Sequence, residues 1–420
     1  MENREGYLEP EEEEEYGKEV EEAKVAPPPA EQRKMRYSPM PVMRRTRGDS
    51  SSTSNITDAS PAFIPAKMPA QLQEIFSSPQ PRLECDEYIR YQSIIADTDF
   101  TTAKGVIHIR IHKPQLQGAV EVSQQSNLSD EDIKDLYANI ASPDNIEHEA
   151  SVSIVFCPRS FSRRQIKNVP ISMQTYLAIE EIFGLPPIAL QVVSSSFPMF
   201  FNFTPRLDSQ NAGHRGLIMN NHIAAFCDFT LISVYDATRR TTKAICFGLS
   251  EPEISIMAKR ITACLYTAHH FLTTPLLLVD YGVEELKYFT EARRAEIRQI
   301  RKYLQMETYL EGNERKALVD PTKINLAHTT AQVTSLSQSV LGLLSRGRAL
   351  MKFVDGLYKE LNSLGKESLP GLHINDKICQ SYRLRLEYLK EAVVSAQDQL
   401  KASYEMLQVQ AEAVCTQYSS

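Results

Sequence analysis

The chain has 420 residues, of which 42% are hydrophobic and 24% charged, and this composition is typical of a soluble globular protein that can bury one or two cores. A net charge of −7 and the lack of tryptophan argue against a dedicated nucleic-acid binder, which would carry a basic face. The sequence shows no apolar secretory signal and no run of about 20 residues apolar enough to span a bilayer. We therefore expect a cytoplasmic protein without a membrane span, either free or peripheral to a membrane through its partners.

Cysteine usage favours the same compartment. The cysteines are odd in number, widely scattered, and form no C-x-x-C pair. This pattern is typical of reduced thiols in the cytosol rather than of a disulfide framework or a zinc site. The seven residues are Cys85, Cys157, Cys227, Cys246, Cys264, Cys379 and Cys415.

Residues 1–82 are predicted to form a disordered, charged tail, because they offer few large apolar side chains to offset the entropy of ordering. The first 31 residues hold twelve acidic and three basic side chains, whereas Arg33–Arg47 holds six basic and no acidic ones. The basic part could contact anionic lipid or nucleic acid, or act as a nuclear-import signal. The charge pattern favours a solvated polyampholyte over these alternatives.

Residues 83–250 are predicted to form a mixed α/β or α+β domain, because short β-branched runs alternate with helix signals. Ser129–Asp132 opens a short helix that runs through Ile140, and Ser172 is a candidate N-cap for a helix over Met173–Phe183. The predicted strands are Val106–Ile111, Ser151–Phe156, Ile188–Val193, Thr230–Tyr235 and Lys243–Phe247.

Residues 251–420 are predicted to form an elongated helical stalk. Pro252 suits the first turn of a helix that runs to about Phe271, and Pro275 then forces a kink or a short break before the helix resumes. We therefore predict a kinked helix over residues 253–311, whose charged middle is solvated or joined by i,i+4 pairs.

Two further helices, over residues 322–364 and 376–418, are predicted from heptad spacing. The connection Gly365–Asn375 lets them pack antiparallel within one chain, and Gly347 marks a weak or close-approach point. The first seam consists of Leu336, Leu343, Leu350, Leu357 and Leu364 with Val333, Val340, Gly347, Val354 and Leu361, and the second of Leu386, Val393, Leu400, Leu407 and Val414.

Motifs with established catalytic or cofactor chemistry are missing from the sequence. It holds no phosphate-binding P-loop, no G-x-G-x-x-G after a strand, no H-E-x-x-H, no G-x-S-x-G and no EF-hand loop. His269 and His270 are adjacent on a predicted helix, so they point about 100° apart and do not form an i,i+4 metal pair. Glu147-His148-Glu149 could hold a divalent cation but fits a solvated loop better. We therefore expect no enzyme, name no catalytic or cofactor-binding residue, and leave metal ligands unassigned.

Several helical segments suggest a family. A strand-rich domain is followed by Leu265–Leu278 (LYTAHHFLTTPLLL), by the charged segment Glu291–Arg298 (EARRAEIR), and by a terminal helix that contains Arg383–Lys390 (RLRLEYLK). In this order, from Leu83 to Ser420, the chain resembles the cytosolic part of the fungal CorA-like magnesium transporters. The resemblance implies a terminal stalk helix, five-fold assembly, and regulatory divalent sites built from carboxylates between subunits.

The resemblance also implies two transmembrane helices after the stalk, with a Gly-Met-Asn motif at the pore mouth. This sequence holds no Gly-Met-Asn, and it ends at Ser420, about where the first span would begin. We therefore expect a CorA-like cytosolic domain that does not transport alone, binds Mg²⁺ weakly if at all, and assembles with itself or with full-length relatives. The alternative is a soluble coiled-coil scaffold unrelated to ion transport.

Overall fold

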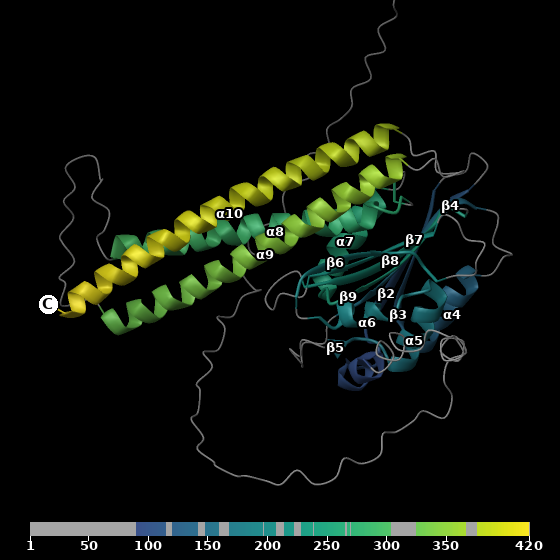
Figure 1. Ribbon diagram of the computed structural model, residues 1–420, viewed down its shortest axis with the longest axis horizontal. Coiled ribbons are helices and arrows are strands. Elements are labelled where there is room, and N and C mark those ends of the chain that lie inside the picture. Colours follow the sequence, from purple (N-terminus) through teal and green to yellow (C-terminus); the bar gives the residue numbers. More distant parts are fainter. Residues whose placement is uncertain are drawn as a thin grey trace, which may run out of the picture. The chain divides into compact units, whose positions relative to one another are not determined.

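A mixed β-sheet and a set of long helices make up the described part of the protein (Figure 1). All described residues belong to one compact unit, Met68–Ser420. The predicted tail, residues 1–82, lies outside them. The computed structural model describes residues 90–114, 120–141, 148–158, 168–195, 197–206, 214–221, 228–237, 239–264, 267–268, 270–303, 325–366 and 376–419.

Within these residues, seven strands form one sheet in the order β3-β2-β4-β9-β8-β7-β6. β4 and β9 run parallel, and every other neighbouring pair is antiparallel. A separate parallel pair is formed by β1 (Asp99–Phe100) and β5 (Asn168–Val169). The large sheet consists of β2 (Val106–Pro114), β3 (Glu121–Leu128), β4 (His148–Cys157), β6 (Met199–Phe203), β7 (His214–Asn220), β8 (Thr230–Asp236) and β9 (Thr241–Phe247).

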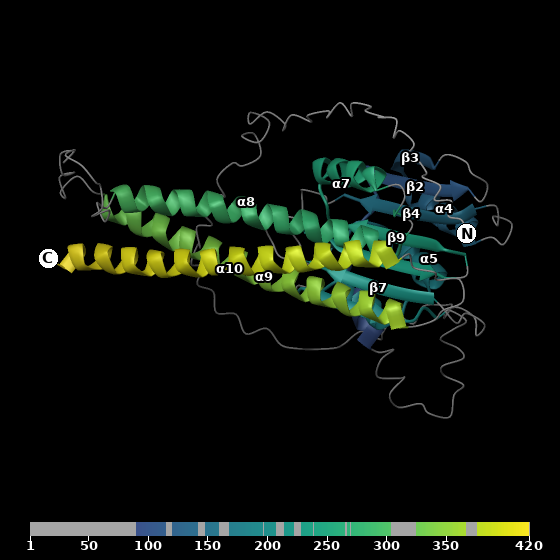
Figure 2. The same cartoon turned by 90° about the horizontal axis from the view of Figure 1, so that it is seen from above.

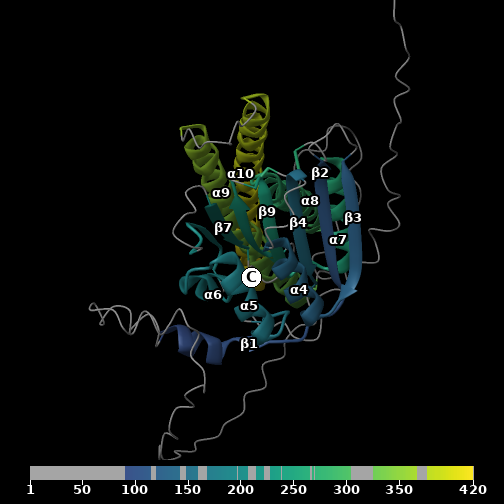
Figure 3. The ribbon, with the colours of Figure 1, turned by 90° about the vertical axis from the view of Figure 1, so that its right-hand side faces the viewer.

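The sheet is buried on both faces because alternate residues of its central strands enter two different cores. In β4, Val152, Ile154 and Phe156 belong to one core, whereas Val155 and Cys157 belong to the other. Figure 3 shows α4, α5 and α6 on one side of the sheet and the long helices α9 and α10 on the other. The helices next to the sheet are α4 (Asp130–Ala141), α5 (Met173–Phe183), α6 (Ile188–Val193) and α7 (Glu251–Ala263).

Most local signals act as the sequence predicts. The Ser172 hydroxyl accepts a hydrogen bond from the Thr175 N–H at 3.2 Å and caps α5, and Gly184 ends that helix with a φ of 60°. The predicted strands around residues 106, 151, 230 and 243 and the helix from Asp130 are confirmed. Pro252 lies in the first turn of α7, behind a capping box formed by Ser250 and Glu253.

The prediction of a strand over Ile188–Val193 is wrong, because these residues form α6. A short, continuous apolar run cannot be assigned to a strand or a helix by periodicity alone. Here Pro187 already has helical dihedral angles, with φ −55° and ψ −28°, and starts the helix. The buried Asn220 side chain donates to the Val192 carbonyl at 2.8 Å, which satisfies one of the free carbonyls at the helix end.

The predicted kinked helix over residues 253–311 is two helices instead. α7 ends at Ala263, and α8 (Thr273–Tyr303) begins ten residues later. Pro275 lies in the first turn of α8, where its missing N–H costs no hydrogen bond, so it starts a helix rather than kinking one. Residues 304–311 lie outside the described part of the chain.

Three long helices, α8, α9 (Leu326–Lys366) and α10 (Asp376–Ser419), lie along one another (Figure 2). α9 and α10 are antiparallel, as predicted, because Asn362 contacts Arg383 while Asp355 contacts Lys390. α8 and α10 are parallel, because Asp280 contacts Arg385 and Arg294 contacts Gln399. The leucines and valines of both predicted seams are buried in one continuous core with α8 and the sheet.

Two glycines permit close approach to α9. A Cβ atom at Gly347 would lie 2.8 Å from Cγ of Gln397 on α10, in agreement with the close-approach point that the sequence predicts there. A Cβ atom at Gly356 would lie 2.6 Å from the Phe200 ring of β6. α9 therefore packs tightly against both α10 and the edge of the sheet.

A buried acid joins the first described helix, residues 90–97, to α5. The Tyr91 hydroxyl donates to the Glu180 carboxyl group. Arg206 and the Tyr176 hydroxyl also lie close enough to interact electrostatically with this carboxyl group. Burial raises the pKa of Glu180 from 4.5 to about 7. Because the folded protein holds the proton more tightly than the unfolded chain, this site stabilises the fold below about pH 4.5, and the stabilisation is lost as the pH rises through about 7.

We expect the free energy of unfolding to fall by up to about 3 kcal/mol between these pH values, at 1.36 kcal/mol for each pKa unit. Urea denaturation at a series of pH values measures this change. Glu180→Gln should remove it, while Glu181→Gln, on an exposed neighbour, should not. An unchanged pH dependence in Glu180→Gln would assign the effect to another group.

Candidate functional site

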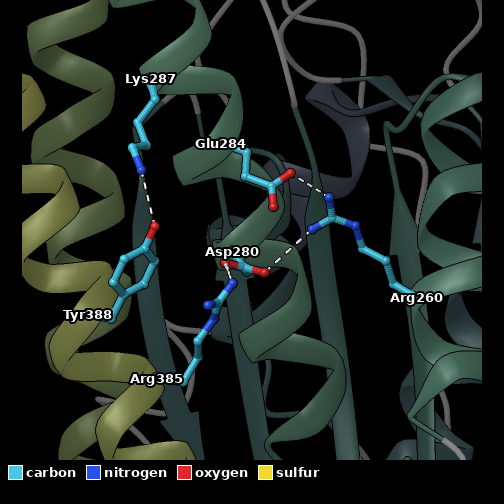
Figure 4. A network of polar contacts seen from close by, with 6 residues as sticks. All are labelled: Arg260, Asp280, Glu284, Lys287, Arg385 and Tyr388. Atoms are coloured by element: carbon cyan, nitrogen blue, oxygen red, sulfur yellow. Dashed lines mark hydrogen bonds and ion pairs between the residues drawn. The ribbon is translucent and has the colours of Figure 1, made fainter. Parts of the chain in front are cut away.

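Six polar residues connect the helices α7, α8 and α10, and we call them the junction network (Figure 4). The network includes Arg260 from α7, the α8 residues Asp280, Glu284 and Lys287, and Arg385 and Tyr388 from α10. Their positions span 128 residues of sequence, so only the fold brings them together. The network lies where α8 leaves the sheet and meets α10.

Asp280 is the centre of the junction network. It is a lone acid in the apolar run Leu276–Val283 of α8, and it is almost completely buried. Arg385 Nη2 donates to Asp280 Oδ1 at 2.6 Å, and Arg260 Nη1 lies 3.5 Å from Asp280 Oδ2. Arg260 also pairs with Glu284. One buried carboxylate therefore joins α7 and α10 through two guanidinium groups, and its hydrogen bond raises the pKa of Arg385 above its ordinary value.

Aromatic rings extend the contact between α8 and α10. Lys287 Nζ donates to the Tyr388 hydroxyl at 3.1 Å, and the Arg385 guanidinium lies 4.9 Å from the centroid of the Tyr388 ring. Such cation–π contacts add roughly 0.5–1 kcal/mol each at partly exposed sites. Nearby, the Tyr382 hydroxyl contacts the Thr273 hydroxyl at the start of α8. The junction network therefore joins α8 and α10 through ion pairs, hydrogen bonds and a cation–π contact.

A second group, which we call the anchor cluster, attaches α9 to the sheet. It consists of Glu360 and Ser363 on α9, Arg215 on β7 and Asn202 on β6. Arg215 Nη1 donates to Glu360 Oε1 at 2.6 Å and to Ser363 Oγ at 2.9 Å, and Asn202 Nδ2 donates to Glu360 Oε2 at 2.8 Å. Both oxygens of a nearly buried carboxylate are thus satisfied by the sheet.

The histidines considered from the sequence do not form a metal site in the described part of the chain. His270 lies in the turn between α7 and α8, where its ring packs edge-on against Tyr382 with centroids 5.0 Å apart. His148 begins β4, while Glu147 and His269 lie outside the described residues. Among the described side chains, no group of three or more His, Cys, Asp or Glu residues is placed to hold a metal ion.

Asp280→Ala should lower the free energy of unfolding by about 1–3 kcal/mol, because it removes a buried acceptor of two charged hydrogen bonds. Both arginines are partly exposed and can regain water, which limits the loss. Chemical denaturation measures the change. Glu284→Ala is the matched control, since Glu284 is largely exposed and its ion pair should contribute less than about 1 kcal/mol. Equal losses in both variants would contradict the central role of Asp280.

None of the described helices combines the length and the apolar character that crossing a bilayer requires. No family model and no curated protein matches the sequence. Solved CorA and ZntB structures match it.

The soluble domain of CorA from Methanocaldococcus jannaschii matches with a TM-score of 0.40 and 11% identity, over 74% of this chain and 96% of that chain. The cytoplasmic domain of ZntB from Vibrio parahaemolyticus matches with a TM-score of 0.42 and 8% identity, over 75% of this chain and all of that chain. The complete CorA magnesium transporter from M. jannaschii matches with a TM-score of 0.36 and 10% identity, over 74% and 77% of the two chains.

These matches agree with the CorA-like resemblance seen in the sequence, although they do not test its fungal assignment.

Proposed function

We propose that this chain is a CorA-like cytosolic domain that works as an assembly module, with neither enzymatic activity nor ion transport of its own. The observation that carries the proposal is the double attachment of the stalk. The junction network fixes α8 and α10 to α7, and the anchor cluster fixes α9 to β6 and β7. Three helices held at separate points transmit any displacement of the sheet along the stalk instead of absorbing it.

The outer surface of α10 supports association with a second copy of the chain. Leu384 and Val409 are 60% and 54% exposed, and Tyr388 is also largely exposed. At about 100° per residue these three positions lie within roughly 60° of one another around the helix. Leu384 and Tyr388 form an exposed apolar patch near the start of α10, and Val409 lies on the same side of the helix, beyond the exposed Glu391, Ser395 and Asp398. Exposed apolar side chains on a long helix can pack against another helix. A second copy offers the same side chains, so the contact can be self-complementary.

The proposal is tested by measuring the mass of the full chain by light scattering, with and without millimolar Mg²⁺. We expect an oligomer. Leu384→Lys with Val409→Lys should reduce the mass to that of the monomer, because the charges cannot be buried in a helix contact. Val122→Lys on β3 is the control, since Val122 is exposed on a different element. A monomer for the unaltered chain under all conditions would refute assembly.

Weak Mg²⁺ binding and association with full-length relatives belong to the same proposal. A pentamer whose mass responds to Mg²⁺ would support a transporter-related role, and co-purification with a full-length CorA-like relative would support it further. The second candidate function is a coiled-coil scaffold unrelated to ion transport, which the 41 and 44 residues of α9 and α10 favour. A dimer indifferent to Mg²⁺ that captures no such relative would favour the scaffold.

A further inference from the structure

One face of the sheet changes from apolar to polar along its strands. On the side where α4, α5 and α6 lie (Figure 3), Val155 and Ile245 occupy paired positions of β4 and β9 and are buried in the apolar core. Two residues earlier in both strands, the same face carries Ser153 and Lys243 instead. Arg110 of β2 pairs with Ser153 from the other side, so it lies on this face too. Arg110, Ser153 and Lys243 therefore form a polar row across three neighbouring strands.

The polar row faces an open part of the surface. Ser123 of the edge strand β3 is paired with Arg110 and is exposed, as is nearly all of that strand. The Arg110 and Lys243 side chains are partly exposed. Ser153, between them, is 2% exposed, and its hydroxyl lies 2.9 Å from Nε2 of His108. An ion can therefore approach both cations from the solvent, and no enclosed cavity is required.

Within the described residues, neither the Arg110 guanidinium nor the Lys243 ammonium forms a hydrogen bond or an ion pair. Asp236 on β8 is the acid whose charge acts on Lys243. Its carboxylate is shared, however, with His214 at 3.4 Å and Arg239 at 3.9 Å. Burial lowers the pKa of both cations, that of Lys243 to about 8. Both cations are therefore partly desolvated without a bonded counter-charge.

The spacing of the two cations fits a single anion between them. Neighbouring strands lie about 4.8 Å apart, so the backbones of Arg110 and Lys243, two strands apart, are separated by about 10 Å. Long Arg and Lys side chains can each span half of that distance. The guanidinium presents a fork of N–H bonds that matches two oxygens of an oxyanion, and the ammonium supplies a point charge. A phosphate group has enough oxygens to bind both.

We infer that Arg110 and Lys243 together bind a phosphate group at the polar row of the sheet. The group comes from inorganic phosphate or from a small phosphate ester. It supplies the counter-charge that both cations lack and stabilises the folded chain according to its occupancy. The polar row lies on the face of the sheet opposite to α9 and α10, so this site does not depend on the proposed assembly function.

Titration calorimetry of the full chain with sodium phosphate, against sodium chloride of matched ionic strength, tests this site. We expect saturable binding to the unaltered chain. Arg110→Met and Lys243→Met should each weaken binding at least tenfold, because each removes one of the two charges that hold the anion. Lys104→Met is the matched control and should bind as the unaltered chain does, since Lys104 is an exposed cation just before β2.

A parallel titration with adenosine monophosphate distinguishes the two sources of the phosphate group. Tighter binding than that of inorganic phosphate, lost in the same two variants, assigns the site to a phosphate ester. Equal binding assigns it to inorganic phosphate.

Thermal unfolding shows whether the variants fold and gives a second measure of binding. Phosphate should raise the Tm of the unaltered chain and of Lys104→Met until the site is saturated, and should not do so in Arg110→Met or Lys243→Met. Absence of binding to the unaltered chain at millimolar phosphate would overturn the inference. Unchanged affinity in both Arg110→Met and Lys243→Met would also overturn it, because the anion would then bind elsewhere.

Discussion

Phe353→Ala should lower the free energy of unfolding by about 3–5 kcal/mol, which is the usual cost of truncating a buried phenylalanine to alanine. Phe353 is completely buried on α9, and its ring packs against Phe229, which immediately precedes β8. The cavity would open at the contact between the stalk and the sheet. If these parts form one cooperative unit, urea denaturation followed by circular dichroism should show a single transition at a lower midpoint.

Leu341→Ala on the same helix is the matched control. Leu341 is exposed, so its truncation should change the free energy of unfolding by less than about 0.5 kcal/mol. Two separate transitions in Phe353→Ala, one of them unchanged in midpoint, would show that the sheet and the stalk unfold independently. That result would also weaken the proposal that the stalk transmits displacements of the sheet.

The long helices could be predicted because their burial follows the local spacing of leucine and valine. Leu343, Leu350 and Val393 are buried, as the heptad pattern requires. What the heptad pattern could not show is how the preceding helix packs against these two. α8 packs along both α9 and α10. Its buried apolar residues are concentrated near its start, and its middle is highly charged, so the sequence shows no regular apolar spacing from which to predict this packing.

The sheet was predicted less completely. β3 has the sequence EVSQQSNL, which alternates weakly and is exposed along nearly its whole length, so it carries almost no hydrophobic signal. β6 and β7 were not predicted, because Asn202 interrupts the apolar run of β6 and Gly216 interrupts that of β7. In the structure Gly216 is required, since a Cβ atom there would lie 2.2 Å from the Phe203 ring on the neighbouring strand. Which residue fits at such a position depends on side-chain packing between neighbouring strands, and the local sequence pattern carries no information about that packing.

The junction network was not predicted from the sequence, although one signal for it exists. A lone acid in an apolar helical run, as Asp280 is, usually has a buried cationic partner, because an unpaired buried carboxylate is too costly. The identity of that partner could not be predicted. Arg385 lies 105 residues away and becomes adjacent only because α8 and α10 run parallel.

Glu360→Ala should be among the most destabilising single changes outside the apolar core, at about 3–5 kcal/mol. The Glu360 and Arg215 side chains are only 10% and 15% exposed. Removing the acid takes the carboxylate acceptor from the nearly buried Arg215 guanidinium, while its hydrogen bond to the Ser363 hydroxyl remains. Breaking a buried ion pair from one side is costly because the remaining charge loses its partner without regaining water. Denaturant titration of the variant measures the loss.

Asp355→Ala is the matched control on the same helix. Asp355 pairs with Lys390 at 3.8 Å, but both side chains are more than half exposed, so its loss should cost less than about 1 kcal/mol. The double variant Arg215→Met with Glu360→Leu should be more stable than Glu360→Ala alone, because it removes both charges and leaves apolar side chains of similar volume. A double variant less stable than Glu360→Ala would mean that Arg215 holds α9 to the sheet through contacts other than this ion pair.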